Sequence, residues 1–84
     1  MAREKQDYRQ QYEILLSKIE TKYPDNMGYM TAEQVAEILN VRLETVYRRS
    51  NEKTNRDPIP RKKIGTNTYR YPIASFIRWS LGGI

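Results

Sequence analysis

Apolar residues follow helical spacing over the first part of the chain. Between residues 4 and 23 they recur three or four positions apart and share one side of an α-helix: Tyr8, Tyr12, Leu15, Leu16, Ile19 and Tyr23. Pro24 ends the pattern, because the residue before a proline is displaced from helical geometry. We predict an amphipathic helix and a turn within residues 1–28. The helix packs either on its own domain or on a second copy of the chain, and we favour the first.

Two shorter helices that meet at a tight corner are predicted next. Thr31 stands three residues before Gln34, and this spacing lets the two side chains cap a helix start reciprocally. Behind them an apolar stripe consists of Ala32, Val35, Ala36, Ile38 and Leu39. The pattern breaks at Asn40, a residue type that tolerates the left-handed conformation of a tight turn. The following helix is predicted from Leu43, with its inner side formed by Val46, Tyr47 and Ser50.

A polar loop and a β-hairpin are predicted after these helices. Residues 51–58 are polar up to a proline and indicate a loop. The segments 59–64 and 68–71 are extended in character and flank the triplet Gly65, Thr66 and Asn67. The glycine and the asparagine accept the positive φ that tight hairpin turns demand, so we place the turn there.

A closing helix is predicted after Pro72, which suits a first helical turn. Its apolar stripe consists of Ile73, Phe76, Ile77 and Leu81. Trp79 lies beside the stripe, and we expect it to have a structural role in the core. The glycine pair at 82–83 ends the helix.

Composition limits the class of protein. The chain has 84 residues, which is enough for one domain, and it contains neither cysteine nor histidine. Disulfides, thiolate metal sites and the commonest general base are therefore absent, and we expect no enzyme activity, no metal and no cofactor. No segment approaches the roughly 18 apolar residues of a membrane span. We expect a cytoplasmic protein without membrane contact.

The positive charge is concentrated toward the end of the chain. Residues 1–30 and 31–57 each carry five basic and five acidic side chains, whereas residues 58–84 carry five basic side chains and no acidic one. The last segment therefore accounts for the whole net charge of +5. A surface of one sign attracts polyanions, of which nucleic acid is the commonest, although charge alone also fits an anionic membrane or an acidic protein.

Residues 29–81 resemble the MerR-like winged helix-turn-helix domains of phage and mobile-element excisionases and AlpA-type regulators. The resemblance is carried, in order, by the first helix and turn at 29–41, Thr-Val-Tyr-Arg at 45–48, Ile-Pro-Arg-Lys-Lys-Ile-Gly at 59–65, Tyr-Arg-Tyr at 69–71 and a helix containing Trp79. It implies a mainly α fold with a small β-hairpin, in which residues 29–84 form the DNA-binding domain. Residues 1–28, with the amphipathic helix that the apolar spacing predicts, have no counterpart in the family's minimal domain. Arg42 occupies the place where the family has a serine or threonine cap, so the cap is made otherwise or the helix starts later.

The resemblance also implies a function. It predicts sequence-specific binding to double-stranded DNA, either as an excisionase that organises attachment-site DNA for an integrase or recombinase, or as a transcriptional regulator of a mobile element. The host compartment would be the cytoplasm of a prokaryotic or phage-infected cell, and the protein could form a homo-oligomer on DNA.

Candidate DNA-contacting residues lie on the predicted recognition helix. The positions that point outward or sideways are Arg42, Glu44, Thr45, Arg48 and Arg49. Arginine suits the O6 and N7 acceptors of guanine, and threonine can donate, accept or contact a thymine methyl group. The alternative is a solvated helix face on which nearby carboxylates, from Glu37, Glu44 and Glu52, neutralise the arginines.

The predicted wing carries a second candidate set, which consists of Arg61, Lys62, Lys63 and Arg70 on the strands and Thr66 and Asn67 at the tip. Side chains alternate between the two faces of a strand, so Arg61 and Lys63 share one face, and Lys62 and Ile64 share the other. These cations therefore cannot all reach one row of phosphates. They either contact DNA or solubilise a sheet edge.

Two classes of function therefore remain open. One is a duplex DNA binder, and the other is a winged-helix interaction module whose basic face binds an acidic protein or structured RNA. Residues 42–70 carry nine basic and three acidic side chains, which combines the helix and the wing in one positive region and favours DNA.

Overall fold

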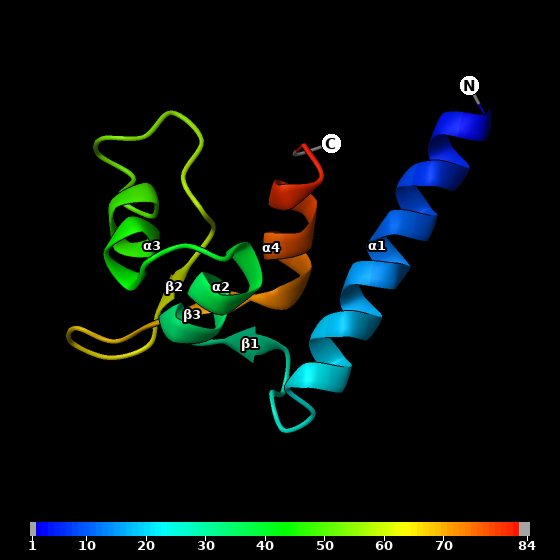
Figure 1. Cartoon of the computed structure of the whole chain (residues 1–84). Coiled ribbons are helices and arrows are strands. Elements are labelled where there is room, and N and C mark those ends of the chain that lie inside the picture. The colour runs from blue at the N-terminus through cyan, green and yellow to red at the C-terminus, as the bar shows by residue number, and fades with distance from the viewer. Residues whose placement is uncertain (1, 83–84) are drawn as a thin grey trace.

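The computed structural model describes the backbone of residues 2–82 and the side chains of residues 7–82. This part of the chain forms four helices and a three-stranded antiparallel sheet (Figure 1). The sequence predicts an N-terminal helix and turn within residues 1–28 and a second region at 29–84. Residue 1 of the first region and residues 83 and 84 of the second lie outside the described residues. No helix among those described is long and apolar enough to cross a membrane.

Helix α1 (Ala2–Lys22) packs lengthwise beside helix α4 (Ile73–Ser80), as Figure 1 shows. Ile19 of α1 is completely buried in the core. Around it, half-buried residues of α1 and the following turn pack against the same core: Tyr12, Leu15, Leu16 and Tyr23. The predicted amphipathic helix is confirmed, and its apolar stripe packs on its own domain.

Helix α2 (Ala32–Leu39) begins and ends as its sequence predicts. The Thr31 hydroxyl accepts a hydrogen bond from the backbone N–H of Gln34, and the Gln34 side chain accepts one from the backbone N–H of Thr31. Asn40 has the left-handed conformation, with φ 57° and ψ 49°. The chain therefore turns within three residues into helix α3 (Leu43–Arg49), which packs against α2.

Val46 of helix α3 is buried, and so is Ser50, the residue that directly follows the helix. The prediction that Tyr47 lies on the inner side is wrong, because 49% of this residue is exposed. Val46 and Ser50 are four residues apart and define the inner side, whereas Tyr47 is rotated about 100° from Val46. Arg42 occupies the N-cap with extended backbone and no side-chain hydrogen bond, so α3 starts without a side-chain cap.

The sheet has the strand order β1–β3–β2, and β3 (Tyr69–Pro72) lies in the middle. Strand β1 (Tyr29–Met30) was not predicted, and β2 (Lys62–Lys63) is shorter than the predicted segment 59–64. Met30 and Tyr71 are paired and both fully buried, so this side of the sheet faces the core. The helices α2 and α4 contact β3.

The hairpin turn spans residues 64–68 and is closed by a hydrogen bond from the Ile64 N–H to the Thr68 carbonyl, at 2.7 Å. The predicted positive φ at Gly65 and Asn67 is wrong, because among the described residues only Gly28, Asn40 and Gly82 have positive φ. A turn of this length reverses the chain over several bends, so it does not require the mirror-image conformation of a two-residue turn.

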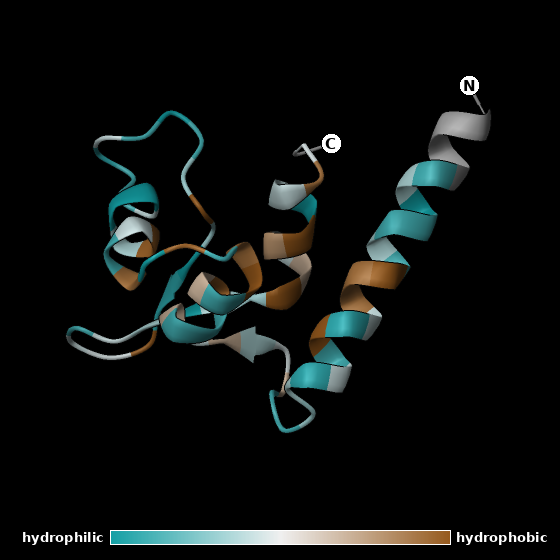
Figure 2. Ribbon diagram, in the orientation of Figure 1, coloured by the Kyte–Doolittle hydropathy of each residue, from teal (hydrophilic) through white to brown (hydrophobic). Residues whose placement is uncertain are grey.

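Helix α4 follows β3 directly, with Pro72 at its N-cap, and the chain leaves it through Gly82 at φ 102°. Gly83 lies outside the described residues. Trp79 is half-buried against the core and stacks on Phe76, with 6.0 Å between ring centroids. Its Nε1–H donates to the Asp57 carbonyl at 3.0 Å, so the expected structural role of Trp79 is confirmed. Figure 2 shows the apolar character of α4 where it meets α1.

Candidate functional site

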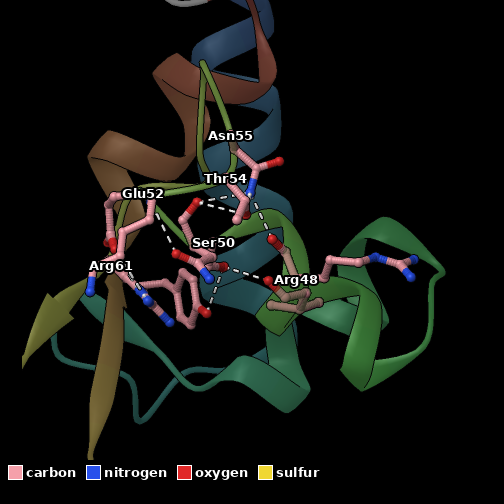
Figure 3. A network of polar contacts seen from close by, with 10 residues as sticks. Arg48, Ser50, Glu52, Thr54, Asn55 and Arg61 are labelled. Carbon is pink, nitrogen blue, oxygen red and sulfur yellow. Dashed lines mark hydrogen bonds and ion pairs between the residues drawn. The ribbon is translucent and has the colours of Figure 1, made fainter.

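The outward side of α3 is polar and exposed. Glu44 and Arg48 are four residues apart, which places them on the same side of the helix, and both are exposed. Arg42, at the start of α3, is also exposed, and Thr45 is half-buried. Figure 3 shows the Arg48 side chain extending away from the polar network that surrounds its backbone. The outward side of α3 therefore presents two guanidinium groups and a carboxylate to solvent.

Two of the three carboxylates that could neutralise these arginines are paired elsewhere. Glu37 accepts a hydrogen bond from the Tyr23 hydroxyl and lies 3.5 Å from the Lys22 ammonium group. The hydrogen bond from Tyr23 lowers the pKa of Glu37, and burial together with Glu37 raises the pKa of Tyr23 to about 12. These contacts tie α1 to α2, so they serve the fold and leave the α3 arginines without Glu37.

The second of these carboxylates, Glu52, forms an ion pair with Arg61. Arg61 Nε and Nη2 lie 3.1 and 3.2 Å from the two oxygens of Glu52. The guanidinium carbon of Arg61 is also 3.9 Å from the centroid of the Tyr69 ring. The hydrogen bond from Arg61 lowers the pKa of Glu52, and the same contact raises the pKa of Arg61. Arg61 therefore connects the loop after α3 to the hairpin by an ion pair. Its side chain is only 12% exposed.

Arg49 differs from Arg48 in its surroundings. Its guanidinium carbon lies 5.7 Å from the centroid of the Trp79 ring of α4. The sequence placed Arg49 among the residues that point outward or sideways, and its exposed position at the side of α3, three residues after the buried Val46, agrees with this. Arg49 is exposed and has an aromatic partner on α4, so its guanidinium group is less available to a ligand than that of Arg48.

A network of hydrogen bonds holds the end of α3 and the 51–58 loop (Figure 3). The Asn55 amide donates to the carbonyls of Arg48 and Asn51, at 2.7 and 2.9 Å. The Asn51 side chain accepts from the backbone N–H of Lys53 at 3.0 Å. The Asn55 amide thus adds a side-chain donor to the Arg48 carbonyl in the last turn of α3, where carbonyls lack regular helical partners. Sequence reasoning did not single out Asn51 and Asn55, although amides just after a helix are suited to this role.

The hairpin places its cations on both sides of the sheet. Lys62 is in register with Arg70 and Lys63 with Tyr69, so the predicted alternation holds for the two lysines of β2, while Arg61 and Ile64 lie just outside this strand. Both lysines are exposed, as are Thr66 and Asn67 in the turn. Arg70 is half-buried, and its Nη1 donates to the Tyr69 carbonyl at 3.0 Å. The freely exposed cations of the hairpin are therefore the two lysines.

Helix α3 and the hairpin turn lie at one end of the molecule, and α1 lies at the other (Figure 1). Of the cations predicted to contact DNA, four are exposed at this end and lack an ion pair or aromatic partner among the described residues: Arg42, Arg48, Lys62 and Lys63. We call these four residues the exposed cation set. Such a set, presented by a helix and a hairpin together, is suited to a polyanion of extended shape.

No group of histidine, cysteine, aspartate or glutamate side chains within the described part of the chain is arranged to hold a metal ion. Comparisons with protein-family models, curated proteins and solved structures yield no match for the chain. The geometry and charge of α3 and the hairpin are therefore the basis for assigning a function.

Proposed function

We propose that the protein is a winged helix-turn-helix domain that binds double-stranded DNA in a sequence-specific manner. The observation that carries the proposal is the position of the exposed cation set, which α3 and the hairpin present at the same end of the molecule. Glu37 and Glu52, which could have neutralised this end, are paired with residues outside the set.

In this proposal α3 is the recognition helix. The major groove of DNA is about 12 Å wide, admits one α-helix and presents a distinct pattern of donors and acceptors for each base pair. Arg48 is suited to the acceptors of guanine, and Glu44 to the amino group of cytosine. Thr45 lies at the edge of the exposed side, and Arg42 is positioned at the start of α3 to reach a phosphate.

The hairpin is the wing. Lys62 and Lys63 contact phosphates, which supply affinity and position but carry no sequence information. Thr66 and Asn67 are short polar side chains at the tip that fit the narrower minor groove. Arg61 has a positioning role here, because its pair with Glu52 and its stacking on Tyr69 orient the wing relative to α3.

The biological output in this proposal is the one that the resemblance implies. The protein acts as an excisionase that organises attachment-site DNA together with an integrase or recombinase, or it regulates a mobile-element promoter. The two outputs share the same DNA interface, and they differ in where the binding site lies.

Fluorescence anisotropy with labelled duplexes tests the proposal. Duplexes selected from a random pool should bind the protein more tightly than unselected ones. The exposed cation set predicts a log–log slope of affinity against salt concentration between about −1.8, for two phosphate contacts, and about −3.6, for four. An RNA hairpin of matched length and an acidic peptide serve as comparisons. Equal or tighter binding to either of them, or no binding to any duplex at low salt, would contradict DNA binding and support the interaction module.

A further inference from the structure

We propose that Ile64 enters the minor groove of bound DNA, inserts between two neighbouring base pairs and kinks the duplex. This inference rests on the proposed function, because it requires that the hairpin meets DNA. It goes further by assigning a DNA-deforming role to one apolar side chain of the wing.

Ile64 is an apolar residue in an otherwise polar hairpin. It is 58% exposed, and every residue from Lys62 to Thr68 is exposed. The other members of this segment are polar, apart from Gly65. Figure 2 shows the hairpin turn in pale to hydrophilic colours apart from one hydrophobic stretch near the sheet. The core therefore does not account for an isoleucine at this position.

The backbone holds Ile64 in a defined place. Its N–H donates to the Thr68 carbonyl at 2.7 Å, and the N–H of Gly65 reaches the same carbonyl at 3.4 Å. Lys62 pairs with Arg70 on the side of the sheet away from the core. Because side chains alternate along a strand, Ile64, two residues after Lys62, is placed on the same outward side. Gly65 adds no side chain that would shield it. The isoleucine is thus presented at the base of the turn, beside cations that can hold phosphates.

The surroundings match the chemistry of a minor-groove wedge. Proteins that bind this groove combine lysine, arginine or amide side chains with an apolar wedge that partly unstacks a base step and bends DNA by roughly 20–90°. Lys62, Lys63 and Asn67 supply the polar part in this hairpin. Residues 58–82 contain no acidic side chain, so no carboxylate on this segment repels the phosphates that flank the groove.

Ile14 provides a matched control. It is also an isoleucine, it is 51% exposed, and it lies on α1 at the end of the molecule opposite α3 and the hairpin. Substitution of either residue removes an exposed side chain, and thermal melting checks that each variant keeps the fold. Ile64→Leu retains an apolar side chain of similar volume, whereas Ile64→Ala removes the wedge.

The experiment measures binding and deformation on the same selected duplex. Donor and acceptor fluorophores at the two ends report bending, and 2-aminopurine moved through successive positions reports unstacking. The parent protein, Ile64→Leu and Ile14→Ala should shorten the end-to-end distance and brighten 2-aminopurine at one step. Ile64→Ala should lose both signals while its affinity stays within about tenfold of the parent, because phosphate contacts supply most of the affinity.

Some other results would overturn the wedge alone, and one would overturn DNA binding as well. Bending by Ile64→Ala equal to that of the parent would overturn the wedge, and so would tight binding by the parent to straight DNA. Both of these results leave the proposed function intact. Absence of duplex binding by the parent, measured as anisotropy before any bending experiment, would overturn the proposed function and the wedge together.

Discussion

The hydroxyl oxygens of Ser50 and Tyr71 lie 2.8 Å apart, and both residues are completely buried. Ser50 directly follows α3, and Tyr71 lies in the central strand β3, which continues from the hairpin. The Ser50 hydroxyl also donates to the Val46 carbonyl at 2.5 Å, so the Tyr71 hydroxyl is the donor between the two side chains. This polar pair joins the candidate recognition helix to the strand that carries the wing.

Removal of the Ser50 hydroxyl should lower the free energy of unfolding more than removal of the Tyr71 hydroxyl. Ser50→Ala leaves the Tyr71 hydroxyl buried without a partner, which costs about 1–3 kcal/mol of unfolding free energy. Tyr71→Phe removes one hydrogen bond but leaves Ser50 bonded to Val46, so it should cost about 0.5–1.5 kcal/mol. Urea denaturation of both variants measures the order, and the double variant should be more stable than Ser50→Ala alone. A larger cost for Tyr71→Phe would show that the pair does not govern stability.

Truncation of Ile19 should destabilise the whole domain. This side chain of α1 is fully buried, and its replacement by alanine should cost about 2–5 kcal/mol through lost burial and a residual cavity. The half-exposed Ile14 on the same helix is the control, and Ile14→Ala should change stability by less than about 0.5 kcal/mol. Should Ile19→Ala prevent folding, Ile19→Val with an expected cost of about 0.5–1.5 kcal/mol takes its place. Equal effects at both positions would mean that α1 contributes no core.

Arg48 and Lys63 should affect DNA binding in different ways. Arg48→Ala is expected to relax preference at one or two base pairs and to cost about 1–3 kcal/mol on the selected duplex only. Lys63→Ala should weaken selected and random duplexes by the same factor and make the salt slope shallower by about 0.9. Lys18→Ala on α1 is the control and should change neither. A uniform loss with Arg48→Ala would reassign Arg48 to phosphate contact and move base recognition to Glu44 or Thr45.

Acid should weaken the attachment of the 51–58 loop. Because Arg61 holds the pKa of Glu52 below its ordinary value of 4.5, the folded state favours the carboxylate more than the unfolded state does. The stabilisation of the folded state by the Glu52–Arg61 pair is present above the ordinary pKa of 4.5, and it is lost as the pH falls through the lowered pKa of Glu52. Melting temperatures of the parent and Glu52→Gln should therefore differ at neutral pH and converge as the pH falls through the lowered pKa of Glu52. Glu37 has a lowered pKa in both proteins and cancels in this comparison. A constant difference across the range would show that the Glu52 charge does not matter.

Local signals in the sequence predicted the helices well. The Thr31–Gln34 spacing located the start of α2, and Asn40 located its end, because caps and left-handed turns depend on residues only a few positions apart. The side chains around α3 were harder to assign. Tyr47 is apolar enough for the inner side, but Val46 and Ser50 occupy that side, and only tertiary packing decides between them.

Long-range relationships could not be predicted from the same signals. Strand β1 has two residues and no periodicity of its own, and it exists because Met30 and Tyr71 pair across the sheet. The Glu52–Arg61 pair was also missed, because charge along the sequence suggested Glu52 as a partner for the arginines of α3. The resulting candidate site is smaller than the predicted one, because Arg49 and Arg61 have partners within the molecule. The four residues of the exposed cation set are exposed, and their contact with DNA stays a prediction.

The pairing of β1 with β3 has a consequence for how the chain acquires its structure during synthesis. Residues before the 51–58 loop contribute α1, β1, α2 and α3, and residues after it contribute β2, β3 and α4. Ile19 and Met30 in the first half share one core with Tyr71 and Phe76 in the second. A nascent chain that has emerged only as far as the loop thus lacks the other side of its core, and cooperative folding awaits the release of α4 from the ribosome.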